Sequence, residues 1–232
     1  MDIQTLPAIA KHWAETCPDR VWLKDLKEEG SDDYTWAESW EQISAIAAML
    51  ETQFGHGQSM VMLSRNRAHW FFADLAIIAS GNITVSMFTT LPGSTAEYIM
   101  NFTEAKVMFV GETTNWEQVS AVLPDDITLI TLPGVDIEQP HLEWDALLAE
   151  WRGKSPAYEC KHDDVMSLVF TSGTTGVPKG VIQTHDTNII PIRRFKDAFG
   201  VRDQARYLSY LPLSHMAERQ IVEFASLEFC GE

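Results

Sequence analysis

Residues 171–179 concentrate the side chains best suited to chemistry, with four hydroxyls, two glycines and a lysine in nine positions. Gly173 and Gly176 allow backbone angles that turn consecutive N–H groups toward one anion, with no Cβ in its way. Lys179 adds a mobile positive charge, and the hydroxyls add hydrogen-bond donors. The hydroxyl residues are Thr171, Ser172, Thr174 and Thr175. The stretch therefore predicts a loop that binds polyphosphate.

The spacing differs from that of the commoner phosphate loops. A Walker loop ends in Gly-Lys-Ser or Gly-Lys-Thr, whereas Lys179 follows Pro178 and precedes Gly180. A dinucleotide loop begins Gly-x-Gly, and the second glycine is missing here. The remaining alternative is a surface turn, which rarely needs so many hydroxyls beside a lysine.

A second candidate site follows the apolar segment 206–211, which we predict to be a strand. Ser214 is then predicted to begin a helix that carries His215, Glu218 and Arg219 on adjoining turns. Open α/β sheets bind ligands at the carboxyl ends of their strands, so this turn is well placed for function. A His215 that only packs or caps a helix is the alternative.

The elements that must position these residues alternate between helical and strand patterns, with Ser94 and Glu97 predicted as a helix capping box. This β-α-β rhythm predicts an α/β fold of mainly parallel sheets flanked by helices. A polar, irregular stretch after Trp151 predicts two lobes, 1–152 and 153–232. Predicted strands are 21–26, 34–36, 59–64, 83–87, 106–110, 127–131 and 180–184, and predicted helices include 70–79, 115–123, 144–151 and 185–199.

Composition excludes some classes of partner. The chain has 232 residues, 45% of them hydrophobic, and a net charge of −16, which argues against nucleic acid. Residues 1–152 contribute −15 and residues 153–232 only −1, so the predicted phosphate loop lies in the less repulsive part.

Cysteine usage and hydropathy predict a cytoplasmic protein. Cys17, Cys160 and Cys230 are isolated in sequence, which favours neither a disulfide framework nor a zinc site. No signal peptide is visible, and the longest apolar run, 70–79, is too short to span a bilayer. We expect no transmembrane segment, and peripheral contact with a membrane stays open.

Two strings together resemble a known family. Phe170–Val181 and Tyr207–Arg219 resemble the adenylate-forming (AMP-binding) superfamily, and the Leu-Pro-Leu-Ser-His run narrows the resemblance to its long-chain fatty-acyl-CoA synthetase branch. Tyr34–Trp36, followed by an amphipathic helix, loosely matches the family's opening signature. The resemblance covers the whole chain but only the N-terminal part of the family's large domain.

The resemblance implies an activity and roles for the candidate residues. Such enzymes join a fatty acid to ATP, releasing pyrophosphate, and then transfer the acyl group from AMP to coenzyme A. By resemblance, Lys179 is catalytic and, with residues 171–176, binds ATP, Thr171 faces Mg²⁺, and His215 lines the acyl pocket near the reacting carboxylate. The implied partners are the small molecules fatty acid, ATP and coenzyme A.

The family's later motifs do not appear before Glu232. Missing are a magnesium-binding glutamate, a ribose-binding aspartate and the C-terminal lid domain with its lysine. We therefore expect a fragment that is inactive alone and that self-associates through an exposed apolar edge. The alternatives are a noncatalytic module that binds a nucleotide or a partner, and a ligase for another carboxylic acid. The preferred acyl-chain length does not follow from the sequence.

Overall fold

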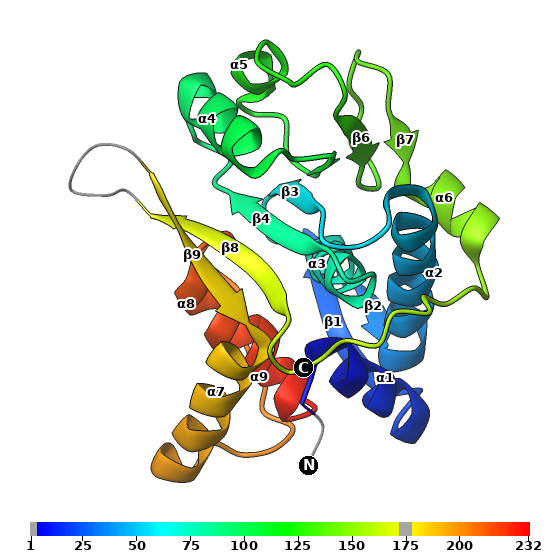
Figure 1. Cartoon of the computed structure of the whole chain (residues 1–232). Helices are drawn as coiled ribbons and strands as arrows, with labels where there is room; N and C mark the ends of the chain where they lie inside the picture. Colours follow the sequence, from blue (N-terminus) through cyan, green and yellow to red (C-terminus); the bar gives the residue numbers. More distant parts are fainter. Residues whose placement is uncertain (1–3, 172–177) are drawn as a thin grey trace.

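Helices and strands alternate along the chain in the computed structural model, which describes residues 4–171 and 178–232 (Figure 1). The strands are β1 (Val21–Leu26), β2 (Ser31–Thr35), β3 (Ser59–Leu63), β4 (Ile83–Met87), β5 (Val107–Val110), β6 (Thr128–Thr131), β7 (Leu142–Glu143), β8 (Val165–Thr171) and β9 (Lys179–Thr184). The helices are α1 (Leu6–Thr16), α2 (Trp36–Phe54), α3 (Ala68–Ala79), α4 (Gly93–Thr103), α5 (Trp116–Ser120), α6 (Trp144–Trp151), α7 (His185–Phe199), α8 (Met216–Glu218), the π-helix η1 (Arg219–Phe224) and α9 (Ala225–Glu228).

The central sheet has the strand order β7-β6-β5-β3-β4-β8-β9. All neighbouring pairs are parallel except β8 and β9, which are antiparallel. Helices α3 and α4 lie on the connections out of β3 and β4, as parallel strands require. The predicted mainly parallel α/β fold is confirmed. The small antiparallel sheet β1-β2 stands apart from this sheet.

The two faces of the sheet bury different sets of helices. Met60 and Met62 of β3 pack into the core formed with α1, α2 and α3. Their neighbours Val61 and Leu63 pack into a second core with α4 and α5. This alternation follows from the period of two along a strand, and Figure 1 shows α3 and α4 on opposite sides of β4. The predicted lobes, 1–152 and 153–232, both contribute strands to this sheet, and the division between them stays a prediction.

Three local predictions were wrong. Helix α4 begins at Gly93 with Pro92 as N-cap, because the Pro92 carbonyl accepts from Thr95 and Ala96, so Ser94 is not the cap. The last helical run begins at Met216 rather than Ser214. Segment 206–211 is not in a sheet: the Tyr210 N–H donates to Glu218, the Leu211 carbonyl accepts from Asn66, and the Tyr207 N–H donates to the Glu232 carbonyl.

Candidate active site

Strands β8 and β9 bring the two ends of the predicted phosphate loop together. They pair antiparallel, and Thr171 lies directly opposite Lys179. Residues paired in this way project their side chains from the same face, with Cβ atoms about 5 Å apart. Both residues are exposed. A hydroxyl and an ammonium group are thus presented side by side where the sheet ends.

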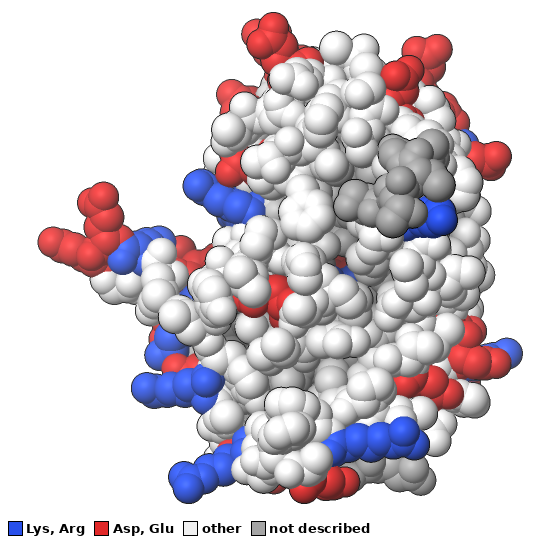
Figure 2. All heavy atoms as spheres, turned by 90° about the vertical axis from the view of Figure 1, so that its left-hand side faces the viewer, with Lys and Arg blue, Asp and Glu red and all other residues white. Residues whose placement is uncertain are grey.

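The other predicted loop residues lie outside the described part of the chain, and their roles stay predictions. They are Ser172, Gly173, Thr174, Thr175 and Gly176. Strands β8 and β9 lie on the side of the molecule that Figure 2 shows, where uncharged residues cover much of the surface. Several exposed apolar residues belong to β9 and α7, namely Val181, Ile182, Ile190, Phe195 and Phe199.

The structure brings His215 to the same edge of the sheet as Thr171. Strand β4 is parallel to β8, with Ser86 paired to Val169, and Phe88 directly follows β4 as Thr171 ends β8. The His215 ring packs edge-on against Phe88, with 6.5 Å between ring centroids. The carboxyl ends of adjacent parallel strands are where α/β sheets bind ligands. The two strings that carried the resemblance therefore meet at one edge.

His215 caps a helix with one ring nitrogen, and its second ring nitrogen is available to bind another group. It is exposed, and its Nδ1 accepts a hydrogen bond from the backbone N–H of Ala217 at 3.2 Å. A neutral imidazole that accepts at Nδ1 carries its proton on Nε2. Among the described residues nothing pairs with this Nε2–H, which can donate to a carboxylate oxygen. The capping alternative is confirmed as geometry, whereas contact with an acyl group stays a prediction.

Asn66, which the sequence reasoning missed, holds the turn before His215. Its amide nitrogen donates to the Leu211 carbonyl at 2.6 Å and to Ser209 Oγ at 2.8 Å, and its oxygen accepts from the Leu213 N–H at 2.9 Å. Asn66 lies three residues beyond the end of β3. One side chain therefore fixes the backbone on both sides of Pro212 to the end of a central strand. An asparagine just after a predicted buried strand was the available signal.

Glu218 holds the same turn from the other side. It is buried, and its Oε1 accepts from Ser209 Oγ and from the Tyr210 N–H, both at 2.9 Å. Since Asn66 also donates to Ser209, the three side chains form a continuous chain of hydrogen bonds. Glu218 thus supports the backbone of the turn.

Arg219 is fully buried and joins three elements. Its guanidinium donates to Ser167 of β8 at 2.8 Å, to Asp74 of α3 at 2.5 Å, and to Glu223 of η1 at 3.3 Å. It also lies over the Trp70 ring, with 5.3 Å to the ring centroid. Because β8 runs on to Thr171, one side chain links the phosphate-loop strand to the helical run after His215.

Burial and neighbouring charges shift the pKa values of Arg219 and Glu223. Burial lowers the pKa of Arg219, but the attraction of Asp74 and Glu223 outweighs burial, so the pKa lies above its ordinary value. Burial and the neighbouring Asp74 carboxylate raise the pKa of Glu223 well above its ordinary value, against the pull of Arg219. Burial and the neighbouring carboxylate thus disfavour the charged form of Glu223 beside the Arg219 cation.

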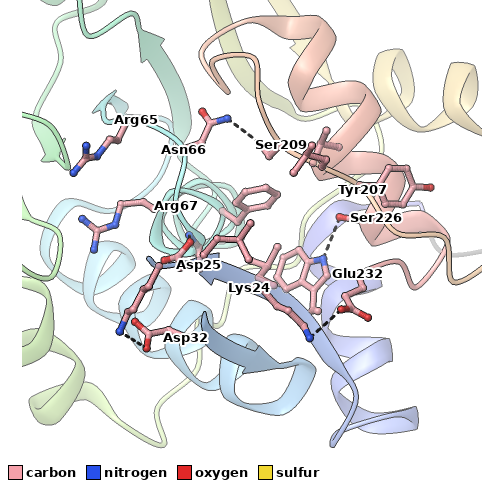
Figure 3. Close-up of a pocket in the computed structure, with 18 of the residues that line it drawn as sticks. Lys24, Asp25, Asp32, Arg65, Asn66, Arg67, Tyr207, Ser209, Ser226 and Glu232 are labelled. Carbon is pink, nitrogen blue, oxygen red and sulfur yellow. Dashed lines mark hydrogen bonds and ion pairs between the residues drawn. The ribbon is translucent and has the colours of Figure 1, made fainter. Parts of the chain in front are cut away.

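A groove of about 800 Å³ lies behind the turn that Asn66 holds, and Asn66 and Ser209 contribute to its lining. It runs between β1 and segment 206–209, and Figure 3 shows Arg65, Asn66 and Arg67 at one end. Its charged groups include ion pairs of Lys24 with Glu232 and of Lys27 with Asp32. None of the sequence-predicted site residues lines it. We assign it no ligand.

The described residues can contribute to a Mg²⁺–nucleotide site but do not enclose one. Within 4–171 and 178–232, no group of three or more His, Cys, Asp or Glu residues could hold a metal ion. Mg²⁺ with a nucleotide commonly takes one or two protein oxygens, the rest coming from phosphates and water. The exposed Thr171 hydroxyl opposite Lys179 suits that arrangement.

The curated proteins that are similar to this chain have the names of enzymes that activate fatty acids. Fatty acyl-CoA synthetase A of Dictyostelium discoideum is 27% identical over 86% of this chain and 32% of its own length. Long chain acyl-CoA synthetase 6, peroxisomal, of Arabidopsis thaliana is 29% identical over 94% of this chain and 34% of its own. The chain therefore spans about a third of the length of these relatives.

Solved structures confirm the fold. Acetoacetyl-CoA synthetase from Streptomyces lividans aligns with 98% of this chain and 37% of its own, with a TM-score of 0.84 and 21% identity. The N-terminal domain of FACL13 from Mycobacterium tuberculosis aligns with 99% of this chain and 56% of its own, with a TM-score of 0.80 and 20% identity.

Two further observations concern the chain as a whole. In the part that the structure describes, no helix combines the length and apolar character needed to span a bilayer. The family profile described as AMP-binding enzyme matches residues 10–230, which is nearly the whole sequence. The protein therefore belongs to the AMP-binding enzyme family.

Proposed function

We propose that this chain provides the phosphate-binding part of a long-chain fatty acid–CoA ligase that works through an acyl-adenylate. The observation that carries the proposal is the meeting of Thr171, Lys179 and His215 at one edge of the parallel sheet. Family membership supports the AMP-binding part, and the names of the curated relatives support the long-chain acyl substrate.

In the proposed first step, a fatty acid carboxylate attacks the α-phosphorus of ATP, and pyrophosphate leaves. Lys179 holds the departing phosphates, where a fixed positive charge stabilises charge that builds up in the transition state. Thr171 lies opposite and offers a hydroxyl oxygen toward Mg²⁺. When bound, Mg²⁺ supplies further neutralisation of the phosphate charge.

His215 orients the attacking carboxylate in this proposal. Its Nε2–H is the group left after Nδ1 has bound Ala217, so the ring can donate one hydrogen bond while remaining neutral. Phe88 packs edge-on against the ring. In the second step, the thiol of coenzyme A displaces AMP to give the acyl thioester.

The relatives are about three times as long as the matched region. Synthesis of acyl-CoA is therefore proposed for a full-length protein that contains this chain, called the assembled enzyme below. The chain alone is proposed to bind Mg²⁺–ATP through the hairpin. It is also proposed to self-associate through the exposed apolar residues of β9 and α7. Peripheral contact with a membrane and a cytoplasmic location stay predictions.

The test uses Lys179→Ala, with Lys161→Ala as a matched control. Both lysines are exposed; Lys179 begins β9, while Lys161 lies before β8 at the opposite end of that strand. Palmitate-dependent exchange between pyrophosphate and ATP should fall about 10²-fold or more in Lys179→Ala when the chain is joined to the remainder of its enzyme. Lys161→Ala should retain wild-type exchange.

Nucleotide affinity of residues 1–232 separates the proposal from its alternatives. Binding of Mg²⁺–ATP should weaken in Lys179→Ala and not in Lys161→Ala. Equal affinity in both variants would contradict the role of Lys179. Nucleotide binding without any palmitate-dependent exchange in the assembled enzyme would instead support a noncatalytic nucleotide-binding module.

A further inference from the structure

The fold brings two cysteines that are 213 residues apart in sequence into contact. Cys17 Sγ lies 3.5 Å from Cys230 Sγ, a distance at which one thiol donates to the other. Cys17 follows α1 as its C-cap, and Cys230 follows α9 by two residues. Both cysteines are free, as is Cys160. Isolation along the sequence therefore did not mean isolation in space.

The backbone on both sides of this contact is well anchored. Trp13 of α1 donates its indole N–H to the Leu227 carbonyl of α9 at 2.7 Å, one helical turn from each cysteine. The Cys17 N–H donates to the Trp13 carbonyl at 2.8 Å. The two sulfurs are thus held in register by the same packing that joins the helices. A disulfide would require them to approach by about 1.5 Å, within reach of side-chain rotation.

We propose that Cys17 and Cys230 form a thiol–disulfide modification site, in which a small-molecule disulfide such as oxidised glutathione crosslinks α1 to α9. This proposal does not depend on the proposed enzymatic function. A dithiol or an excess of reduced glutathione should reverse it, because thiol–disulfide exchange is an equilibrium.

The reaction balances as two exchanges. The half-exposed Cys17 thiolate attacks one sulfur of oxidised glutathione, whose S–S bond breaks, and one glutathione leaves as the thiolate and takes up a proton. Cys230 then loses its proton to solvent, and its sulfur attacks Cys17 Sγ and displaces the second glutathione. Two protein thiols are oxidised, and one external disulfide is reduced to two thiols.

The environment of each sulfur predicts the order of events. Cys230 is 4% exposed, and burial and the contact with Cys17 raise its pKa to about 12. External reagents should therefore reach Cys17 first, since the thiolate is the attacking species and access limits the rate. Ring closure by Cys230 should be the slower step and should accelerate as the pH rises.

Cys160 supplies an internal control. It is half-buried, it donates to the Ile78 carbonyl at 3.4 Å, and burial raises its pKa to about 12. No other cysteine contacts it among the described residues. A crosslink that required no preformed geometry would involve Cys160 as readily as the other two.

The experiment incubates reduced residues 1–232 with mixtures of oxidised and reduced glutathione and maps the cysteines by mass spectrometry. The expected product has lost two hydrogen atoms, joins the Cys17 and Cys230 peptides, and leaves Cys160 as a thiol. It should unfold at a temperature roughly 5–15 °C higher than the reduced chain, because the crosslink closes a very long loop. Cys160→Ser should behave as wild type.

Variants decide between this site and general thiol reactivity. Cys230→Ser should stop at glutathione bound to Cys17, and Cys17→Ser should form no crosslink. If Cys230→Ser folds poorly, peptide mapping of the wild type answers the same question without a variant. Crosslinks to Cys160, disulfide-linked dimers, or glutathione on Cys17 of the wild type with no ring closure would each overturn the proposal, as would an unchanged unfolding temperature after crosslinking.

Discussion

Replacing Arg219 by methionine should destabilise the chain more than any exposed substitution. Methionine retains much of the apolar volume of the side chain but removes the charge that faces Asp74 and the donor to Ser167. Arg219 and Asp74 both have fully buried side chains, so water cannot take over these bonds without opening the core. The carboxylate of Asp74 would then stand in the interior without a counter-charge.

The expected loss is about 3–5 kcal/mol, the range typical of removing one partner from a buried ion pair. For a chain of this size, such a loss lowers the unfolding temperature by roughly 6–20 °C. Arg206→Met is the matched control, because Arg206 also pairs with a carboxylate, Glu232, but its side chain is 81% exposed. An exposed pair typically contributes about 0–1 kcal/mol, so Arg206→Met should lie near wild type.

The assay is equilibrium unfolding in urea, followed by tryptophan fluorescence, on residues 1–232. A double variant, Arg219→Met with Asp74→Asn, tests whether the loss comes from the stranded charge. It should be more stable than Arg219→Met alone, because neither ion remains buried. A loss below about 1 kcal/mol in Arg219→Met, or a double variant less stable than both single variants, would refute the reasoning.

Three further predictions concern pH, substrate and turnover. Glu223→Gln should stabilise the chain relative to wild type increasingly as pH rises above about 4.5, the ordinary pKa of glutamate, because folded wild type then holds a proton on Glu223 that its unfolded chain releases, a cost that glutamine removes. Parallel unfolding free energies for wild type and variant from pH 5 to 9 would contradict this. The assembled enzyme should activate palmitate better than acetate or benzoate, since each buried methylene of the acyl chain adds about 0.8 kcal/mol of binding free energy. Competition assays that favoured acetate or benzoate would exclude a long-chain substrate. Residues 1–232 alone should release no AMP from ATP, palmitate and coenzyme A, because the magnesium-binding glutamate, the ribose-binding aspartate and the lid lysine that the resemblance implies do not appear among them. Sustained AMP release with thioester formation would show that residues 1–232 suffice.

Apolar periodicity was enough to predict most of the sheet. Strands β3, β4, β5 and β6 are short apolar runs separated by helical patterns, and such runs become parallel neighbours because each helix returns the chain to the same edge. The pattern carries no information on the direction of β9. Only seven residues connect Thr171 to Lys179, too few for a crossover, and this length required an antiparallel hairpin.

The polar contacts that position the site could not be predicted from local pattern. Asn66 precedes the turn that it holds by more than 140 residues, and Asp74 lies 145 residues from Arg219. Asp74 interrupts an apolar helix, and a charge in such a run indicates a buried partner without identifying it. The segment 206–211 is apolar enough to resemble a strand, but Asn66 and Glu218 bind the Leu211 carbonyl and the Tyr210 N–H.

The hydrogen bonds of Asn66, Glu218 and Arg219 explain how the turn before His215 is fixed in place although it belongs to no sheet. Asn66 ties the turn to the end of β3, Glu218 ties it to its own following helix, and Arg219 ties that helix to β8. Strand β8 continues to Thr171, so the hydroxyl opposite Lys179 and the imidazole of His215 share one buried scaffold. Disturbing Arg219 should therefore shift both halves of the site relative to each other. An Arg219→Lys variant that still folds should lose palmitate-dependent exchange while retaining affinity for Mg²⁺–ATP, because the ammonium cannot make the three directed bonds of the guanidinium.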